Sequence, residues 1–204
     1  ALDNSYGSGG TVFTDFGGTE DCLVLAVQKD GKILAAGITN VSGGTQLALA
    51  RHFANGGLEA AFGTNGRVLT SLPGDYGAPT GIVIQEDGKI VLSAITGGAS
   101  NALYRYNPDG TLDSSFGTAG RLDIVLGQAY SGGPDVCLQH DGKLVVAGAI
   151  GMDFGVARYH ANGTLDTSFG IGGTTVVSFT AGRDFAVAVQ LQADGKIVAA
   201  GRVE

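Results

Sequence analysis

The stretch that decides the fold is residues 135–148, DVCLQHDGKLVVAG, in which two apolar runs flank the turn His140-Asp141-Gly142. An Asp-Gly pair between two apolar runs is a strong β-hairpin signal, because glycine adopts positive φ angles without a steric penalty from Cβ. The apolar runs are nearly continuous, which suits strands that are covered on both faces. The sequence therefore predicts antiparallel strands over Asp135–Gln139 and Lys143–Gly148.

This stretch belongs to an internal repeat with a period of 53 to 57 residues. Asp-Gly-Lys triplets begin at Asp30, Asp87, Asp141 and Asp194. Pairs of an aromatic residue and glycine begin at Tyr6, Phe62, Phe116 and Phe169. An arginine beside an aromatic residue or a histidine recurs as Arg51, Arg105 and Arg158. Because three unrelated landmarks keep one period, we take the repeat as the organising feature of the chain.

Each repeat reads as four short strands. In the third repeat the hairpin is followed by a strand over Phe154–Tyr159, a turn over Ala161–Asp166 and a last strand over Thr174–Phe179. A four-stranded unit of this length, repeated along a chain without helical periodicity, is typical of a β-propeller, in which neighbouring blades cover each other's apolar faces. We predict an all-β propeller of about four blades of four antiparallel strands, with the last blade incomplete.

The predicted propeller is one domain over residues 1–204, with repeats at 18–74, 75–128, 129–182, and 183–204 together with 1–17. The fourth copy lacks the segment that matches Met152–Gly163. Two arrangements fit this pattern. Either the termini meet in a four-bladed ring with a gap, or the chain is half of a larger ring, completed by further sequence or by a second copy in a homodimer.

The repeat motif resembles a known family. The stretches Gln192–Gly201, Val156–Gly170 and Asn107–Gly117 are similar to the bacterial delta-60 repeat. This resemblance implies a β-propeller domain of unknown function, an extracellular or cell-surface setting in large bacterial proteins, and no catalytic residues to transfer. The first copy departs from the pattern, because Gly57–Phe62 replaces the usual Thr-Leu-Asp-x-Ser-Phe form.

Composition excludes several classes of protein. The chain has a formal net charge of −7 with 12 Lys and Arg, which does not suit phosphate contacts with nucleic acid. No apolar run approaches the length of a membrane span, and the first residues lack the features of a signal peptide. The chain does not begin with Met, so we expect a processed chain or a fragment. Cys22 and Cys137 are expected to be small buried hydrophobic residues, with one long-range disulfide as the alternative.

The repeated polar and aromatic residues are interpreted as architecture. We expect Phe62, Phe116 and Phe169 to wedge between blades, and each repeated arginine to pair with a carboxylate of the following turn. The histidines are expected to be exposed at strand ends or in a turn; they are His52, His140 and His160. No metal site or cofactor is predicted. Calcium is the alternative, because Asn107–Asp113 is a partial match to a calcium loop.

The loops that vary between repeats gather on one face of the predicted propeller, and variable loops on one face often form the binding surface. The blade connections on that face supply aromatic residues, carboxylates and one arginine, which suit a sugar or peptide ligand. The candidate ligand-binding residues are Phe16, Asp75, Tyr76, Tyr130, Asp135, Arg183 and Asp184. The alternative role of the three aromatic residues is to cap the blades.

Three functions remain open at this point. The favoured one is a non-catalytic module that binds a carbohydrate or a protein on the variable face. The second is a propeller lyase or hydrolase with an acid–base pair among Asp75, Asp135, Arg183 and Asp184. The third is a purely structural repeat of a larger bacterial surface protein.

Overall fold

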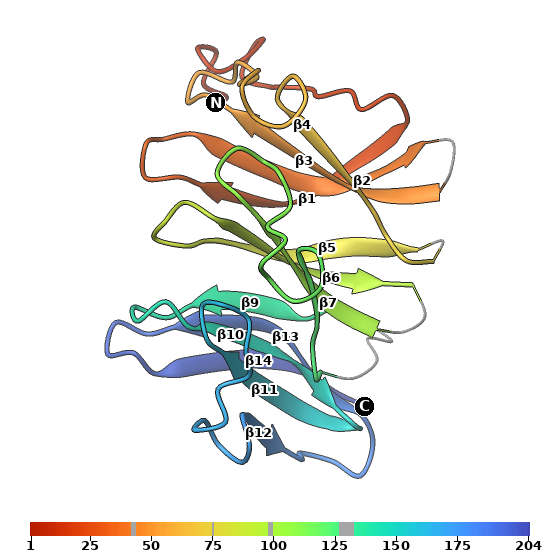
Figure 1. Ribbon diagram of the computed structural model, residues 1–204, viewed down its shortest axis with the longest axis vertical. Coiled ribbons are helices and arrows are strands. Elements are labelled where there is room, and N and C mark those ends of the chain that lie inside the picture. The colour runs from red at the N-terminus through yellow and green to blue at the C-terminus, as the bar shows by residue number, and fades with distance from the viewer. Residues whose placement is uncertain (42–43, 75, 98–99, 127–132) are drawn as a thin grey trace.

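The computed structural model describes residues 1–204 except 42–43, 75, 98–99 and 127–132. The described residues form β-strands and turns without a helix, arranged as three four-stranded sheets and one two-stranded sheet (Figure 1). Each sheet is a blade of consecutive antiparallel strands. The prediction of an all-β propeller with an incomplete last blade is therefore confirmed.

The strands follow the repeat. Blade 1 consists of β1 (Thr19–Val27), β2 (Ile33–Val41), β3 (Gly44–His52) and β4 (Arg67–Ser71). Blade 2 consists of β5 (Gly77–Ile84), β6 (Ile90–Thr96), β7 (Ser100–Tyr106) and β8 (Arg121–Asp123). Blade 3 consists of β9 (Asp135–Leu138), β10 (Leu144–Ile150), β11 (Asp153–Tyr159) and β12 (Thr174–Val177). Blade 4 consists of β13 (Asp184–Leu191) and β14 (Ile197–Val203).

The Asp-Gly turns form the predicted hairpins. In blade 3 the N–H of Gln139 donates to the carbonyl of Lys143 over 2.8 Å, and Gly142 takes a φ of 82°. The Asp141 carboxylate accepts the backbone N–H of Lys143, which fixes the turn from its own side chain. All four hairpin turns repeat the backbone bond and the positive glycine φ, and they lie along the left side of Figure 1.

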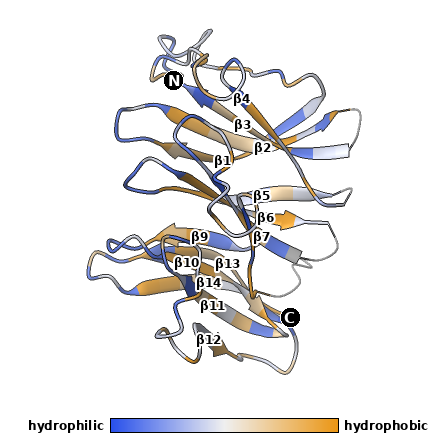
Figure 2. Cartoon of the chain, in the orientation of Figure 1, coloured by the Kyte–Doolittle hydropathy of each residue, from blue (hydrophilic) through white to orange (hydrophobic). Residues whose placement is uncertain are grey.

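The apolar core lies between the blades rather than within them. Blades 1 and 2 enclose one cluster around Leu34, Phe62 and Tyr106, and blades 2 and 3 enclose a second around Phe116 and Leu144. A third cluster joins blade 3 to blade 4. Figure 2 shows hydrophobic residues along the strands and hydrophilic residues at the hairpin turns. Each blade is therefore stabilised mainly by its neighbours, as in repeat proteins generally.

The blades form an open stack rather than a closed four-bladed ring. The N-terminal segment lies on blade 1 at one end of the stack, where the N–H of Gly7 donates to the carbonyl of Asn55, and blades 3 and 4 overlap at the other end of the view (Figure 1). Among the described residues, β13 and β14 pair only with each other. The structure therefore does not have the four-bladed ring in which the termini meet.

Two expectations for buried and exposed residues are wrong. Cys22 is exposed, and only Cys137 is buried; both thiols are free. His52 is buried rather than exposed, and its ring lies between the Thr14 hydroxyl and the carbonyl of Gly56. Both differences arise on the outer face of blade 1. No other blade covers this face among the described residues, so Cys22 remains exposed, while the N-terminal segment covers His52.

Candidate functional site

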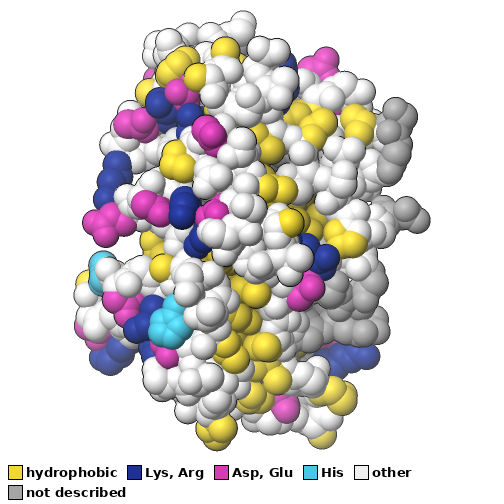
Figure 3. All heavy atoms as spheres, in the orientation of Figure 1, with side chains coloured by type: hydrophobic (Ala, Val, Ile, Leu, Met, Phe, Trp, Pro, Cys, Tyr) yellow, Lys and Arg dark blue, Asp and Glu magenta, His cyan; other side chains and the backbone are white. Residues whose placement is uncertain are grey.

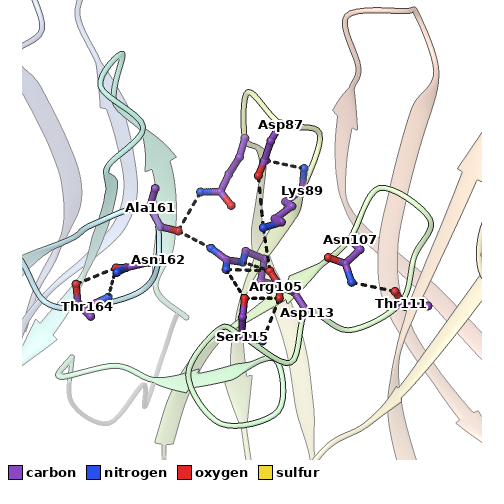
Figure 4. A network of polar contacts seen from close by, with 11 residues as sticks. Asp87, Lys89, Arg105, Asn107, Thr111, Asp113, Ser115, Ala161, Asn162 and Thr164 are labelled. Atoms are coloured by element: carbon purple, nitrogen blue, oxygen red, sulfur yellow. Dashed lines mark hydrogen bonds and ion pairs between the residues drawn. The ribbon is translucent and has the colours of Figure 1, made fainter.

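The repeated arginine is the centre of a polar network, which in blades 1 and 2 also reaches the next blade. In blade 2 the Nε of Arg105 donates to Asp113 Oδ2 over 2.8 Å, and Nη1 donates to the carbonyl of Ala161 in blade 3 (Figure 4). The guanidinium lies 4.4 Å from the centre of the Phe116 ring, within the range of cation–π attraction. Lys89 completes the network with its Nζ 3.3 Å from Asp113 Oδ2.

The same network recurs in blades 1 and 3. Arg51 lies over Phe62 at 4.3 Å and pairs with Glu59, which replaces the aspartate of the later copies. Arg158 lies over Phe169 at 4.6 Å and pairs with Asp166 over 2.8 Å. The prediction that each repeated arginine pairs with a carboxylate of the following turn is confirmed. The networks of Arg51 and Arg105 also join their blades to the next one.

The carboxylates of these networks have lowered pKa values. Burial alone would raise the pKa of Asp113, but hydrogen bonds from Ser115 and Lys89 and the charge of Arg105 outweigh burial and lower it. The hydroxyl of Ser168 is the largest cause of the lowered pKa of Asp166, and Arg158 adds to it. Both groups are therefore ionised at neutral pH, as pairing with arginine requires.

Acidification is expected to destabilise the fold. Unfolded aspartates have a pKa of about 3.9, above the folded values of Asp113 and Asp166, so the unfolded chain takes up protons first as the pH falls. The contribution of these two carboxylates to the free energy of unfolding is complete above about pH 5. It is lost as the pH falls toward their folded pKa values. The urea concentration at the unfolding midpoint, measured near pH 7, 5 and 3, should fall between pH 5 and pH 3. For the Asp113→Asn variant this fall should be smaller. An unchanged midpoint near pH 3 would contradict this expectation.

The structure describes five of the seven candidate ligand-binding residues; Asp75 and Tyr130 lie outside the described residues. Tyr76 is 65% exposed and Arg183 is exposed beside the C-terminus, where its carbonyl accepts the N–H of Glu204. Phe16 and Asp135 line two different cavities. The five described residues are therefore spread over several parts of the molecule.

Asp184 is fully buried and fixes a blade connection. Its carboxylate accepts the backbone N–H groups of Phe179 and Thr180 and the hydroxyl of Thr180. Burial would raise its pKa, and these hydrogen bonds lower it. Glu20, at the matching position of blade 1, accepts the N–H groups of Phe16 and Gly18 in the same way. Asp184 therefore stabilises the connection between blades 3 and 4, whether or not it also contacts a ligand.

Asp135 lies in a central cavity of about 510 Å³ that residues of all four inner strands line. Those strands are β1, β5, β9 and β13. Burial raises the pKa of Asp135, while the N–H groups of Val189 and Val136 donate to its two oxygens and partly offset that rise. A buried carboxyl with a raised pKa is a feature of general acids. Here both oxygens already accept backbone bonds, and the bond from Val189 joins blade 4 to blade 3.

Sequence reasoning missed a groove of about 450 Å³ on the outer face of blade 1. Strands β1, β2 and β3 form its floor, and the N-terminal segment forms one wall. Apolar lining residues include Val12, Phe16, Leu25, Ile33 and Ala48. Its polar lining residues are Tyr6, Thr14, Glu20, Asp21, Cys22 and His52. The repeat predicts that blade 1 has an apolar sheet face. Whether another blade covers that face depends on how the blades are arranged in the folded chain.

The described residues hold no cluster of three or more His, Cys, Asp or Glu side chains that could bind a metal ion. No helix long and apolar enough to cross a membrane occurs among them.

Comparison with known proteins identifies the family of the repeats. The family described as "Domain of unknown function (DUF5122) beta-propeller" matches residues 28–62, 85–116 and 139–169, each match running from the repeated Gln to the repeated Phe. No curated protein matches the chain. A crystal structure of a protein of unknown function from Bacteroides caccae is similar with a TM-score of 0.51 at 12% identity; the match covers 91% of this chain and 54% of that one. The chain thus spans about half the length of that protein and shares its fold. Three repeats of the chain therefore match this family, and the chain has the β-propeller fold that the family's description names.

Proposed function

We propose that the protein is a non-catalytic binding module that holds apolar side chains of a partner protein in the groove of blade 1. The observation that carries this proposal is the groove itself, which is concave, mainly apolar and about 450 Å³ in volume. Pockets of this size with few polar groups are typical ligand sites. Apolar residues of the first strand continue the surface, since Leu23, Leu25 and Val27 are 49%, 63% and 69% exposed.

Two polar side chains of the groove, His52 and Glu20, already have hydrogen-bond partners, which favours a protein over a carbohydrate. The Nε2 of His52 lies 3.1 Å from the Thr14 hydroxyl, and its Nδ1 lies 3.2 Å from the Gly56 carbonyl. Glu20 already accepts hydrogen bonds from Gly18 and the Thr39 hydroxyl. A sugar buries many hydroxyls, and each one without a partner is costly. Leucine, phenylalanine or methionine side chains need no such partners.

Binding should depend on the Cys22 position. Cys22 is an exposed thiol that lines the groove, whereas Cys137 is buried and burial raises its pKa to about 11. A bulky aromatic maleimide should therefore modify Cys22 selectively and fill the groove. Peptides selected from a displayed library against the unmodified protein should then lose affinity by about tenfold or more, which is about 1.4 kcal/mol. Affinity is measured by fluorescence anisotropy.

The Cys22→Ser variant is the matched control, because it keeps the size of the side chain but does not react. After the same treatment it should bind the selected peptides as well as the untreated protein does. A glycan array run in parallel tests the carbohydrate alternative. Glycan binding without any selected peptide, or peptide binding that survives modification of Cys22, would refute the proposed site.

A further inference from the structure

A second groove lies along β4, the last strand of blade 1, and we call it the rim groove. Its volume is about 880 Å³, larger than either cavity described above. One wall is the turn of blade 2 over residues 109–112, and another includes Asp15 and Phe16 of the N-terminal segment. Among the described lining residues, the rim groove shares only Phe16 with the groove of blade 1, so the two are separate cavities.

The two walls of the rim groove are joined to blade 1 by matching hydrogen bonds. On the side of blade 2, the N–H of Gly63 donates to the carbonyl of Asp109 over 2.7 Å. On the other side, the N–H of Gly7 donates to the carbonyl of Asn55 over 2.9 Å. The N-terminal segment therefore packs on blade 1 as blade 1 packs on blade 2, and both walls are regular junctions of this repeat.

Arg67 supplies a positive charge that no residue of the described chain neutralises. Its guanidinium forms no hydrogen bond or ion pair among the described residues, and its Nε is buried without a partner. The equivalent arginine of blade 2, Arg121, pairs through Nη2 with Asp123. Blade 1 has Leu69 at the position of Asp123. The Arg67 guanidinium is therefore available to a carboxylate, which it can bind through two parallel hydrogen bonds.

The turn before β4 adds two polar side chains without partners among the described residues. They are the hydroxyl of Thr64 and the carboxamide of Asn65, both exposed and both lining the rim groove. Asn65 has a φ of 52°, and Ala119 takes a φ of 51° at the equivalent place in blade 2, so the turn does not require the carboxamide. A hydroxyl and an amide can both donate and accept hydrogen bonds, as the hydroxyls of a sugar do.

The remaining lining favours a sugar with one negative charge over a strongly acidic peptide. Leu69 and Leu112 are 44% and 38% exposed, and they offer apolar surface to the C–H groups of a sugar ring. Asp15 and Asp109 can accept hydrogen bonds from sugar hydroxyls, but they repel a run of acidic side chains. On the face drawn in Figure 3, side chains of both charge signs are interspersed along the left side, where the hairpin turns of Figure 1 lie, and neither sign forms a large patch.

We propose that the rim groove binds a carbohydrate that carries a uronic acid. The uronate carboxylate pairs with the guanidinium of Arg67. Hydroxyls of the carbohydrate bond with Thr64 and Asn65, and the apolar face of a sugar ring lies on Leu69. This site is separate from the groove of blade 1, so either site can be tested without the other.

The test measures binding of two uronate probes to the intact chain by isothermal titration calorimetry at low salt. One probe is a xylotriose that carries one glucuronic acid, and the other is trigalacturonic acid. Saturable binding of at least one probe is expected. The same probe after reduction of its carboxylates to alcohols should bind about tenfold or more weakly, because it keeps the hydroxyls but loses the charge that pairs with Arg67.

A pair of variants at one position tests the role of the arginine. Leu69→Asp copies the arginine–aspartate pair of blade 2, so the new carboxylate should occupy Arg67 and weaken probe binding by about tenfold or more. Leu69→Asn loses the same apolar contact without adding a charge, and it should bind the probe about fivefold or more tightly than Leu69→Asp. Circular dichroism confirms that both variants are folded. Leu69→Asp should leave the affinity for peptides selected against the groove of blade 1 unchanged.

A matched pair of arginine variants provides the control for position. Arg67→Met should lose about tenfold or more in probe affinity, whereas Arg121→Met, in which the replaced arginine already has a partner, should lose none. Absence of saturable binding of both probes, or equal probe affinity of Leu69→Asp and Leu69→Asn, would overturn the proposal. Equal affinity for hexaglutamate would also overturn it, because the rim groove would then bind an acidic peptide.

Discussion

Replacing Phe116 by alanine is expected to lower the free energy of unfolding by about 3–5 kcal/mol, as is typical for a phenylalanine deleted from a packed core. The Phe116 ring is fully buried between blades 2 and 3. It contacts the turn at Gly163 on one side and lies under the Arg105 guanidinium on the other, so its removal leaves a cavity at a junction of two blades. Urea denaturation followed by circular dichroism measures the change.

Phe169→Ala provides the matched comparison at the same position of the next repeat. Phe169 also lies under an arginine, but it is only partly buried because no further turn covers it among the described residues. Its removal should cost roughly half as much, since less apolar area leaves the interior. Equal losses for the two variants would show that burial at the blade junction does not set the contribution of these rings.

The repeat made most of the fold predictable. The Asp-Gly turns, the β-hairpins and the pairing of Arg105 with Asp113 follow from residues that recur at one spacing, and local turn chemistry fixes them whatever lies nearby. The first copy shows why the arginine network tolerates variation. Glu59 is one methylene longer than aspartate, yet it pairs with Arg51 at the same place.

The candidate site was less predictable because it depends on which surfaces are covered. The blade 1 groove exists because strand faces that are buried in blades 2 and 3 are open in blade 1, and the Gln-x-Asp-Gly-Lys hairpin motif occurs in covered and open blades alike. The sequence predicts a buried Cys22 because it does not show that this face of blade 1 is open. Asp184 was chosen as a ligand contact from its loop position, but its hydrogen bonds to the Thr180 backbone and hydroxyl depend on how the loop folds back.

Replacing Arg105 by methionine should lower the free energy of unfolding by about 3–5 kcal/mol, because it removes the arginine from the buried Asp113 carboxylate and leaves only Lys89 and Ser115 as its partners. The side chains of Arg105 and Asp113 are only 6% and 9% exposed. The substitution also removes the hydrogen bond to Ala161 that joins blades 2 and 3, while methionine keeps much of the apolar packing on Phe116. Urea denaturation near pH 7 gives the loss.

A double-mutant cycle identifies the cause. Combining Arg105→Met with Asp113→Leu removes both charges, so the double variant should be more stable than Arg105→Met alone, although it still lacks the bond to Ala161. Arg158→Met, in the more exposed network of blade 3, should cost less than Arg105→Met because water can reach Arg158 and the described residues show no bond from it to a following blade. If the double variant were no more stable than Arg105→Met, the loss would come from the missing inter-blade bond or from packing rather than from an unpaired carboxylate.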